Sequence, residues 1–246
     1  MKRALIVGGA NGIGLSIATQ LAKRDDYDKI YILDKAVVAD EFLHSKFVSI
    51  LFDLTSEDYS VFDGFNDVDT LMITAGFGKL NLFKDVSEQY ISNSFAVNTI
   101  APIRIIHHFM DKLLNNNDFY CGVMVSIAGF MSSPFFAVYG ATKAALKIFI
   151  ESVNVELEKS GSCNRILNVS PGSIKGTSFN KGKTDLDLLK TLATDILKNL
   201  EAKNDLFIPN YDETYKEVLA RYQSDFRKEG RHSYDYKVES NRIVEQ

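Results

Sequence analysis

The sequence predicts an α/β fold, a doubly wound parallel sheet in a single domain. Short and continuously apolar runs alternate with stretches of helical periodicity along residues 1–209. This alternation is typical of buried parallel strands with helices on both faces of the sheet. A chain of 246 residues is also long enough for one large domain with its own core.

The strands and helices are expected in a regular order. The apolar runs predict strands over residues 4–7, 30–33, 47–52, 70–74, 123–126 and 165–169, with 207–209 as a candidate for a seventh. Helical periodicity predicts helices over about 13–24, 87–114 and 139–159. After Pro209 the sequence becomes polar, charged and rich in tyrosine, which predicts a helix over about 212–228 and an extended tail from Ser233.

The chain is therefore divided into a main domain, residues 1–209, and a C-terminal appendage, residues 210–246. The appendage is expected to pack on the same domain or on a neighbouring subunit, and we favour a contact in a homo-oligomer. The stretch 211–236, with five tyrosines and many charges, fits a cover over a neighbouring subunit, over the mouth of the active site, or only over the edge of its own domain.

Composition limits the classes of function. A net charge of −4 and a pI of about 5.6 give no sign of nucleic-acid binding. No apolar run approaches the roughly 18 residues of a membrane span, and the four apolar residues before Gly8 are too few for a signal-peptide core. Cys121 and Cys163 lack CxxC spacing, and we expect two buried thiols in a cytoplasmic protein. The adjacent His107 and His108 point to different helix faces, so no metal site is predicted.

Three glycines, Gly8, Gly12 and Gly14, join the first strand to the first helix. In this context the backbone of glycine, which has no side chain, can approach a pyrophosphate closely. The helix N-terminus also points its N–H groups and the positive end of the helix dipole at the pyrophosphate. The alternative is a turn that needs glycine only for positive φ. Asp34 ends the second strand, 20 residues beyond Gly14.

A carboxylate at the position of Asp34 accepts hydrogen bonds from ribose hydroxyls and repels a 2′-phosphate. The glycine turn contains no arginine or lysine that would bind this phosphate. The pattern therefore favours NAD over NADP as the cofactor, the alternative being that Asp34 is a solvated residue at a strand end.

Tyr139 and Lys143 stand at i and i+4 of a predicted helix, and Ser126 stands 13 residues before Tyr139. The two helical residues lie on one face, one turn apart. A neighbouring ammonium stabilises a phenolate, so we expect it to lower the pKa of the tyrosine from its ordinary value of about 10. Any helix with an aromatic and a basic residue on one face would show the same spacing.

Taken together, these motifs resemble those of the short-chain dehydrogenase/reductase family over most of residues 1–209. The resemblance implies a Rossmann-like fold and a catalytic set made of Ser126, Tyr139, Lys143 and Asn98. It implies that Asp53 meets the adenine, that Asn98 holds a water, and that Ile174 meets the nicotinamide amide. The cofactor-binding residues it implies are Gly8, Asn11, Gly12, Ile13, Gly14, Asp34, Asp53, Leu54, Ala75, Gly76, Tyr139, Lys143, Pro171, Gly172 and Ile174.

Some positions depart from the family pattern. Val7 replaces a threonine, Ile73 and Thr74 replace two asparagines, and Thr177 falls one residue late. The resemblance also implies that residues 172–205 close as a lid. Lys175, Lys181 and Lys183 in this segment fit either an acidic substrate or solvated loop lysines. Phe130, Met131, Phe135 and Phe136 fit either an apolar pocket wall or helix packing.

The activity implied by the resemblance is the interconversion of a secondary alcohol and a ketone by an NAD(P)-dependent oxidoreductase. Tyr139 is expected to act as the general acid and base. The substrate is expected to be a small molecule, and the protein a dimer or tetramer. Two alternatives stay open: a nucleotide-sugar epimerase or dehydratase, and a catalytically silent NAD-binding sensor or scaffold.

Overall fold

Seven parallel strands form one sheet, which confirms the predicted fold class. The computed structural model describes residues 1–115, 117–177, 179 and 182–240. The strands are β1 (Lys2–Val7), β2 (Tyr27–Asp34), β3 (Phe47–Leu51), β4 (Thr70–Ile73), β5 (Tyr120–Met124), β6 (Ile166–Val169) and β7 (Leu206–Phe207). They pair in the order β3-β2-β1-β4-β5-β6-β7.

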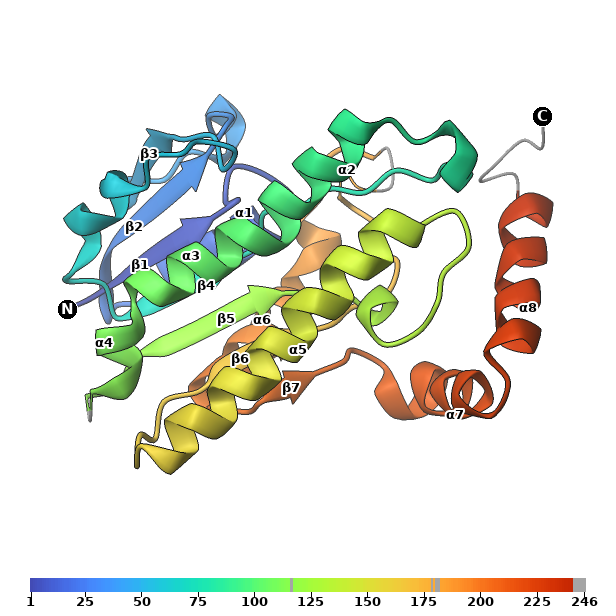
Figure 1. Ribbon diagram of the computed structural model, residues 1–246. Coiled ribbons are helices and arrows are strands. Elements are labelled where there is room, and N and C mark those ends of the chain that lie inside the picture. The colour runs from blue at the N-terminus through green and yellow to red at the C-terminus, as the bar shows by residue number, and fades with distance from the viewer. Residues whose placement is uncertain (116, 178, 180–181, 241–246) are drawn as a thin grey trace.

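The strand order reverses at β1, which pairs in parallel with β2 on one side and with β4 on the other. In open α/β sheets, ligands bind outside the carboxyl ends of the strands at this switch point. Figure 1 shows the strand arrows pointing toward the side of the molecule where the C-terminal helices lie. Residues that follow the strands gather on this side of the sheet.

Helices cover both faces of the sheet (Figure 1). One face carries α1 (Gly12–Ala22) and α6 (Leu186–Glu201), and the other carries α3 (Ala101–His108), α4 (Met110–Leu114) and α5 (Ala137–Lys159). Within β1, Leu5 and Val7 belong to the core under α3 and α5, whereas Ala4 and Ile6 belong to the core under α1 and α6. Because successive side chains of a strand alternate between faces and both faces are covered, the strand is apolar throughout.

Short segments connect the main elements. They are the 3₁₀ turns η1 (Asp40–Phe42), η2 (Ser60–Phe65), η3 (Phe83–Asp85) and η5 (Ile127–Gly129), and the π-helical turns η4 (Ala96–Ile100) and η7 (Tyr211–Tyr215). Of the described helices, none combines the length and apolar character needed to span a membrane. The prediction that both cysteines are buried is wrong for Cys163, which is exposed between α5 and β6.

The single helix predicted over 87–114 is in fact interrupted. It consists of α2 (Glu88–Phe95), the π-helical turn η4, α3 and α4, with Phe109 between the last two. Pro102 accounts for the first interruption, because it has no N–H to donate to the carbonyl of Asn98 four residues earlier. The Ala101 N–H donates instead to the Ala96 carbonyl, five residues back, as in a π-helix.

Nearly half of the segment predicted as a lid (residues 172–205) is the core helix α6, which is 16 residues long. Asp185 caps its N-terminus by accepting hydrogen bonds from the Asp187 and Leu188 N–H groups. Its buried face repeats at helical spacing and joins α1 in the core. Before Leu186, residues 172–177 and 182–185 form no helix or strand.

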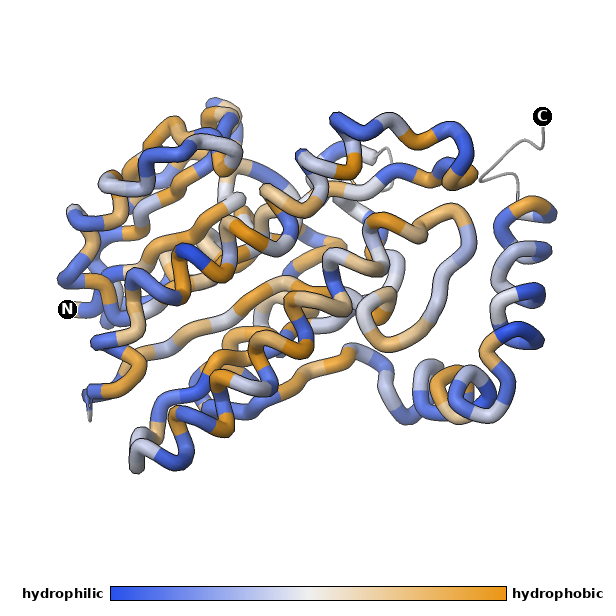
Figure 2. The backbone as a smooth tube through the Cα atoms, in the orientation of Figure 1, coloured by the Kyte–Doolittle hydropathy of each residue, from blue (hydrophilic) through white to orange (hydrophobic). Residues whose placement is uncertain are grey.

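The C-terminal appendage contains two helices, α7 (Lys216–Ser224) and α8 (Phe226–Glu239). The extended tail predicted from Ser233 is therefore wrong as far as Glu239, and residues 241–246 lie outside the described residues. Asp225 divides the two helices because its extended backbone ends α7 while its carboxylate accepts from the Arg227 and Lys228 N–H groups and caps α8. Figure 2 shows α8 as hydrophilic along most of its length, which explains why its sequence gives little helical periodicity.

Candidate active site

The glycine-rich turn needs glycine for space as well as for backbone conformation. Gly8 and Gly12 have φ values of +84° and +54°. A Cβ on Gly14 would lie 2.4 Å from the Gly8 carbonyl oxygen and 2.4 Å from the Thr74 Oγ1. The turn is therefore packed tightly against the residues that follow β4, as a close approach to a phosphate requires.

The N-terminus of α1 fits a diphosphate group. Asn11 occupies the N-cap without a side-chain hydrogen bond to the helix, and the first turn contains no acidic residue. The N–H groups and the positive end of the helix dipole therefore face the carboxyl edge of the sheet without a competing carboxylate from the helix itself. The Gly12 N–H donates to the Thr184 hydroxyl at 2.9 Å, so Thr184 lies at the expected phosphate position.

Asp34 is the last residue of β2, and Asp53 follows β3. The Asp34 carboxylate accepts hydrogen bonds from the Ala10 N–H at 3.0 Å and the Ala36 N–H at 3.2 Å. Asp53 accepts from the Thr55 N–H and hydroxyl, each at 2.8 Å, and these bonds lower the pKa of its carboxyl. Asp53 is thus held in a local turn, with Leu54 packed against the core.

Tyr139 lies buried at the start of α5, close to Ser126. Burial raises the pKa of Tyr139 to about 12, while a hydrogen bond with Ser126 opposes this rise. Ser126 follows β5, and its Oγ accepts from the Ala128 N–H at 3.1 Å. The rings of Phe136 and Phe179 lie 5.4 Å and 5.3 Å from the tyrosine ring and close the space beside it.

Lys143 lies one turn further along α5 and is 2% exposed. Its Nζ donates to the Met124 carbonyl at 2.8 Å and lies 5.8 Å from the centre of the Tyr139 ring. Burial lowers the pKa of Lys143 to about 7. The prediction that the pKa of Tyr139 lies below its ordinary value is therefore wrong for this structure, because burial disfavours the charged form of both groups.

Asn98 lies in the π-helical turn and is completely buried. Its Oδ1 accepts from the Phe77 N–H at 3.0 Å, and its Nδ2 donates to the Phe77 carbonyl at 2.8 Å and to the Thr142 Oγ1 at 3.2 Å. Thr142 donates in turn to the Tyr139 carbonyl at 2.7 Å. The side chain of Asn98 thus ties the segment after β4 to the helix that carries Tyr139.

Ala75 and Gly76 connect this brace to the glycine turn. A Cβ on Gly8 would lie 2.3 Å from the Ala75 nitrogen, and a Cβ on Gly76 would lie 3.2 Å from both Asn98 Oδ1 and Lys143 Nζ. Thr74, which stands where the family has an asparagine, donates to the Val7 and Gly8 carbonyls at 3.0 Å. The ends of β1 and β4 are thereby held together.

Pro171 and Gly172 follow β6 and lie next to Ser126. The Pro171 carbonyl accepts from the Ile127 N–H at 3.0 Å, and the Ser126 hydroxyl lies 3.5 Å from it. Two residues on, the Ile174 carbonyl accepts from the Thr177 hydroxyl at 3.1 Å. These contacts bring the ends of β5 and β6 together at one edge of the site.

Most sequence-predicted site residues thus lie near the carboxyl ends of the strands, whereas Asn98 lies in the π-helical turn η4 and Lys143 lies within α5. Sequence reasoning missed two residues at the site, Thr184 and Phe179, because each comes from a segment without a recognisable motif. Lys175 and Lys183 are exposed, as solvated loop lysines are, and Lys181 lies outside the described residues.

The C-terminal helix α8 supports the loop between Ser126 and Tyr139. Lys237 donates to the Ser133 hydroxyl at 2.8 Å and to the Pro134 carbonyl at 2.9 Å. Phe135 has a φ of +68°, which is unfavourable for a bulky residue, and its ring packs against Tyr234 with the centres 4.5 Å apart. Helix α8 therefore contacts the loop between Ser126 and Tyr139 of its own chain.

Comparison with known families matches residues 2–187 to the short chain dehydrogenase model. The uncharacterized oxidoreductase TDA5 of Saccharomyces cerevisiae is 28% identical over 185 residues, which cover 71% of this chain and 56% of TDA5. The short-chain dehydrogenase RED1 of Pyricularia oryzae is 29% identical over 206 residues, covering 79% of this chain and 69% of RED1. The chain spans little more than half the length of TDA5.

Solved structures share the fold. A bulky-bulky ketone specific alcohol dehydrogenase from Comamonas testosteroni superposes with a TM-score of 0.73 at 22% identity, covering 91% of this chain and 92% of that one. A short-chain dehydrogenase/reductase from Burkholderia phymatum in complex with NAD gives 0.73 at 17% identity, covering 90% and 92%. With the family match over three quarters of its length, the chain belongs to the short-chain dehydrogenase/reductase family.

Proposed function

We propose that the protein is an NAD-dependent oxidoreductase that interconverts a secondary alcohol and a ketone. The observation that carries this proposal is a buried phenol, Tyr139, placed between Ser126 and Lys143 beside a helix N-terminus suited to a diphosphate. The name of the Comamonas testosteroni structure, an alcohol dehydrogenase, supports the same class of reaction.

NAD, when bound, would supply or accept the hydride. In the direction of reduction, Tyr139 donates its phenolic proton to the carbonyl oxygen of the substrate. Ser126 donates a hydrogen bond to the same oxygen and stabilises the negative charge that develops there. Lys143 would hold the ribose hydroxyls of the cofactor and stabilise the tyrosinate, and in oxidation the tyrosinate accepts the proton back. Phe136 and Phe179 exclude water from the phenol.

The Tyr139→Phe variant tests this function. We expect it to bind NADH with wild-type affinity, measured by NADH fluorescence, and to lose ketone reduction by at least about a hundredfold, because general acid catalysis is lost. Tyr211→Phe, an exposed tyrosine of the appendage, is the matched control. A Tyr139→Phe variant with near-wild-type turnover would refute the proposal.

Two other outcomes identify the alternative functions. If the wild type binds NADH but turns over no carbonyl compound of a broad panel, the result favours a sensor or scaffold. If it instead consumes a nucleotide-sugar without net change in NADH, the protein is an epimerase or dehydratase.

We further propose that Asp34 selects NAD over NADP. Its carboxylate stands at the end of β2, against the glycine turn, where it would meet the 2′ position of the adenosine ribose. Asp34→Ser removes the repulsion of a 2′-phosphate, so the ratio of kcat/KM for NADPH to that for NADH is expected to rise by about tenfold or more. An unchanged ratio would show that the preference is set elsewhere.

We also propose that the protein is a cytoplasmic homo-oligomer. Ile100, Ile148 and Val155 are 51%, 57% and 56% exposed on η4 and α5, and Ile148 and Val155 are seven residues apart on one helix face. Light scattering of the wild type and of Ile148→Lys gives the subunit number. A wild-type monomer would contradict the oligomer.

A further inference from the structure

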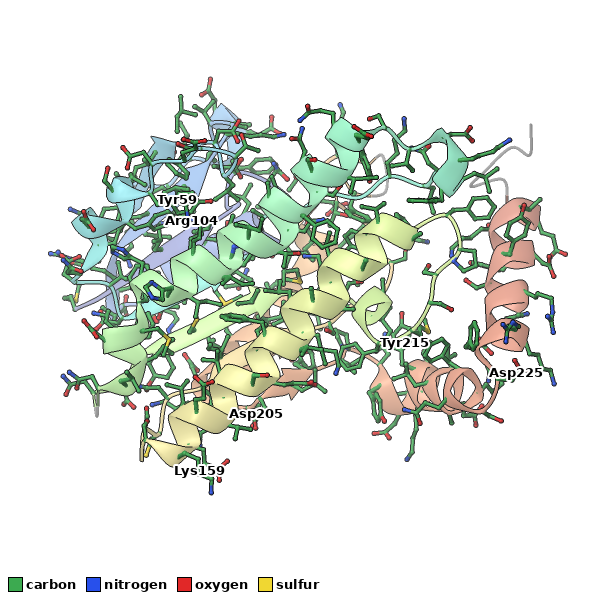
Figure 3. All side chains as sticks on the ribbon, in the orientation of Figure 1. Tyr59, Arg104, Lys159, Asp205, Tyr215 and Asp225 are labelled. Carbon is green, nitrogen blue, oxygen red and sulfur yellow. The ribbon has the colours of Figure 1, made fainter. Side chains whose placement is uncertain are left out.

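Tyr215 reaches from the C-terminal appendage to the backbone of Gly172. It belongs to the π-helical turn η7, just after β7, and Figure 3 shows it between α7 and the body of the protein. A Cβ built on Gly172 would lie 1.7 Å from the Tyr215 hydroxyl oxygen and 2.8 Å from its Cζ. The phenol therefore rests directly on Gly172, in space that any other residue at position 172 would occupy.

This position is close to the hydroxyl of Ser126. The carbonyl of Pro171, the residue before Gly172, lies 3.5 Å from the Ser126 Oγ and accepts the Ile127 N–H at 3.0 Å. The Tyr215 hydroxyl is therefore separated from Ser126 by little more than one peptide unit. In the proposed function, Ser126 holds the oxygen of the substrate carbonyl, and Tyr215 contacts the Pro171–Gly172 segment beside this serine.

The Tyr215 hydroxyl is available for a ligand. Within the described part of the chain, no hydrogen bond to it is formed, and burial is the cause that raises its pKa. The group therefore stays protonated at neutral pH and can donate.

We propose that Tyr215 is a specificity-determining residue that donates a hydrogen bond to a second oxygen next to the reacting carbonyl. The preferred substrates are accordingly vicinal dicarbonyl or 2-hydroxycarbonyl compounds, and the ring of Tyr215 closes the pocket on the side of Gly172. The inference rests on the proposed function, because it places the substrate carbonyl at Ser126 and Tyr139.

The test compares Tyr215→Phe with the wild type on two matched pairs of ketones. The pairs are butane-2,3-dione with butan-2-one, and 1-phenylpropane-1,2-dione with 1-phenylpropan-1-one. We expect Tyr215→Phe to lower kcat/KM about tenfold for each dione, as the loss of one hydrogen bond predicts, and less than about twofold for each monoketone. Comparing variants on the same substrate removes the difference in intrinsic reactivity between diones and monoketones.

Tyr211→Phe, in the same turn but exposed, is the control and should leave kcat/KM unchanged for both ketones of each pair. Melting temperature and NADH affinity are measured for each variant, and both should match the wild type. If kcat/KM of Tyr215→Phe falls equally for the dione and the monoketone of a pair, or does not fall for the diones, the inference is overturned while the proposed function stays intact. A wild type that binds NADH and reduces none of the ketones overturns both.

Discussion

Replacing Asn98 by alanine would show how much of the site depends on one buried amide. The side chain makes three hydrogen bonds, two to the Phe77 backbone and one to Thr142, and none of its surface is exposed. Each bond contributes about 1 kcal/mol net, so Asn98→Ala should lower the free energy of unfolding by about 3 kcal/mol. For a chain of this size, that corresponds to a fall in melting temperature of about 6–12 °C.

Urea-induced unfolding followed by circular dichroism measures this loss directly. Asn98→Asp separates hydrogen bonding from packing, because the carboxylate has nearly the same shape but cannot donate to the Phe77 carbonyl or to Thr142. It should be destabilised at least as much as Asn98→Ala. Asn93→Ala, on α2, removes one bond to Gln89 near the surface and should stay within about 0.5 kcal/mol of the wild type.

Turnover in these variants is a second measurement. A Cβ on Gly78 would lie 2.8 Å from the Tyr139 ring, so the segment that Asn98 holds is in contact with the phenol. We therefore expect ketone reduction to fall together with stability. If Asn98→Ala melts within about 2 °C of the wild type, the hydrogen bonds of Asn98 are not the brace described above.

Three further predictions concern other parts of the site. In Gly172→Ala the new methyl would overlap the Tyr215 hydroxyl, so kcat/KM for the monoketone butan-2-one should fall at least about tenfold, and adding Tyr215→Ala should restore most of this kcat/KM in a double-mutant cycle. Independent effects of the two substitutions would contradict the contact. Because burial lowers the pKa of Lys143 from 10.5 to about 7, the unfolded state binds more protons between these values. The free energy of unfolding should therefore rise from pH 7 to pH 9 in the wild type more than in Lys143→Met, and equal slopes in urea titrations would refute this. Lys237→Met removes the bonds to Ser133 and Pro134, so amide hydrogen exchange of residues 130–136 should become faster, whereas Lys216→Met on exposed α7 should leave it unchanged.

The sheet and the glycine turn could be predicted because local sequence dictates them. Strands such as Ala4–Val7 within β1 are buried on both faces, so they must be apolar throughout, and Gly14 has no room for a side chain. Tyr139 and Lys143 share a helix face because their spacing fixes it. These features depend on residues that are close in the sequence, or on burial that a continuous apolar run indicates.

The remaining features depend on contacts between distant segments. The helix α8 is largely hydrophilic and is attached through single residues such as Lys237 and Tyr234, so its sequence shows little amphipathic period. The interruption at Asn98 follows from Pro102, but its use as a brace depends on Phe77, 21 residues earlier. The approach of Tyr215 to Gly172 joins residues that no spacing rule relates.

The bonds from Lys237 to Ser133 and Pro134 also mean that, during synthesis of the chain, the loop is made well before the residue that supports it. The loop that separates Ser126 from Tyr139 receives its last support from a residue 103 positions after Pro134. At ordinary translation rates of about 5–20 residues per second, this support arrives about 5–20 s after the loop itself. A nascent chain can therefore form its sheet and bury Tyr139 while the loop between Ser126 and Tyr139 still lacks its hydrogen bonds to Lys237.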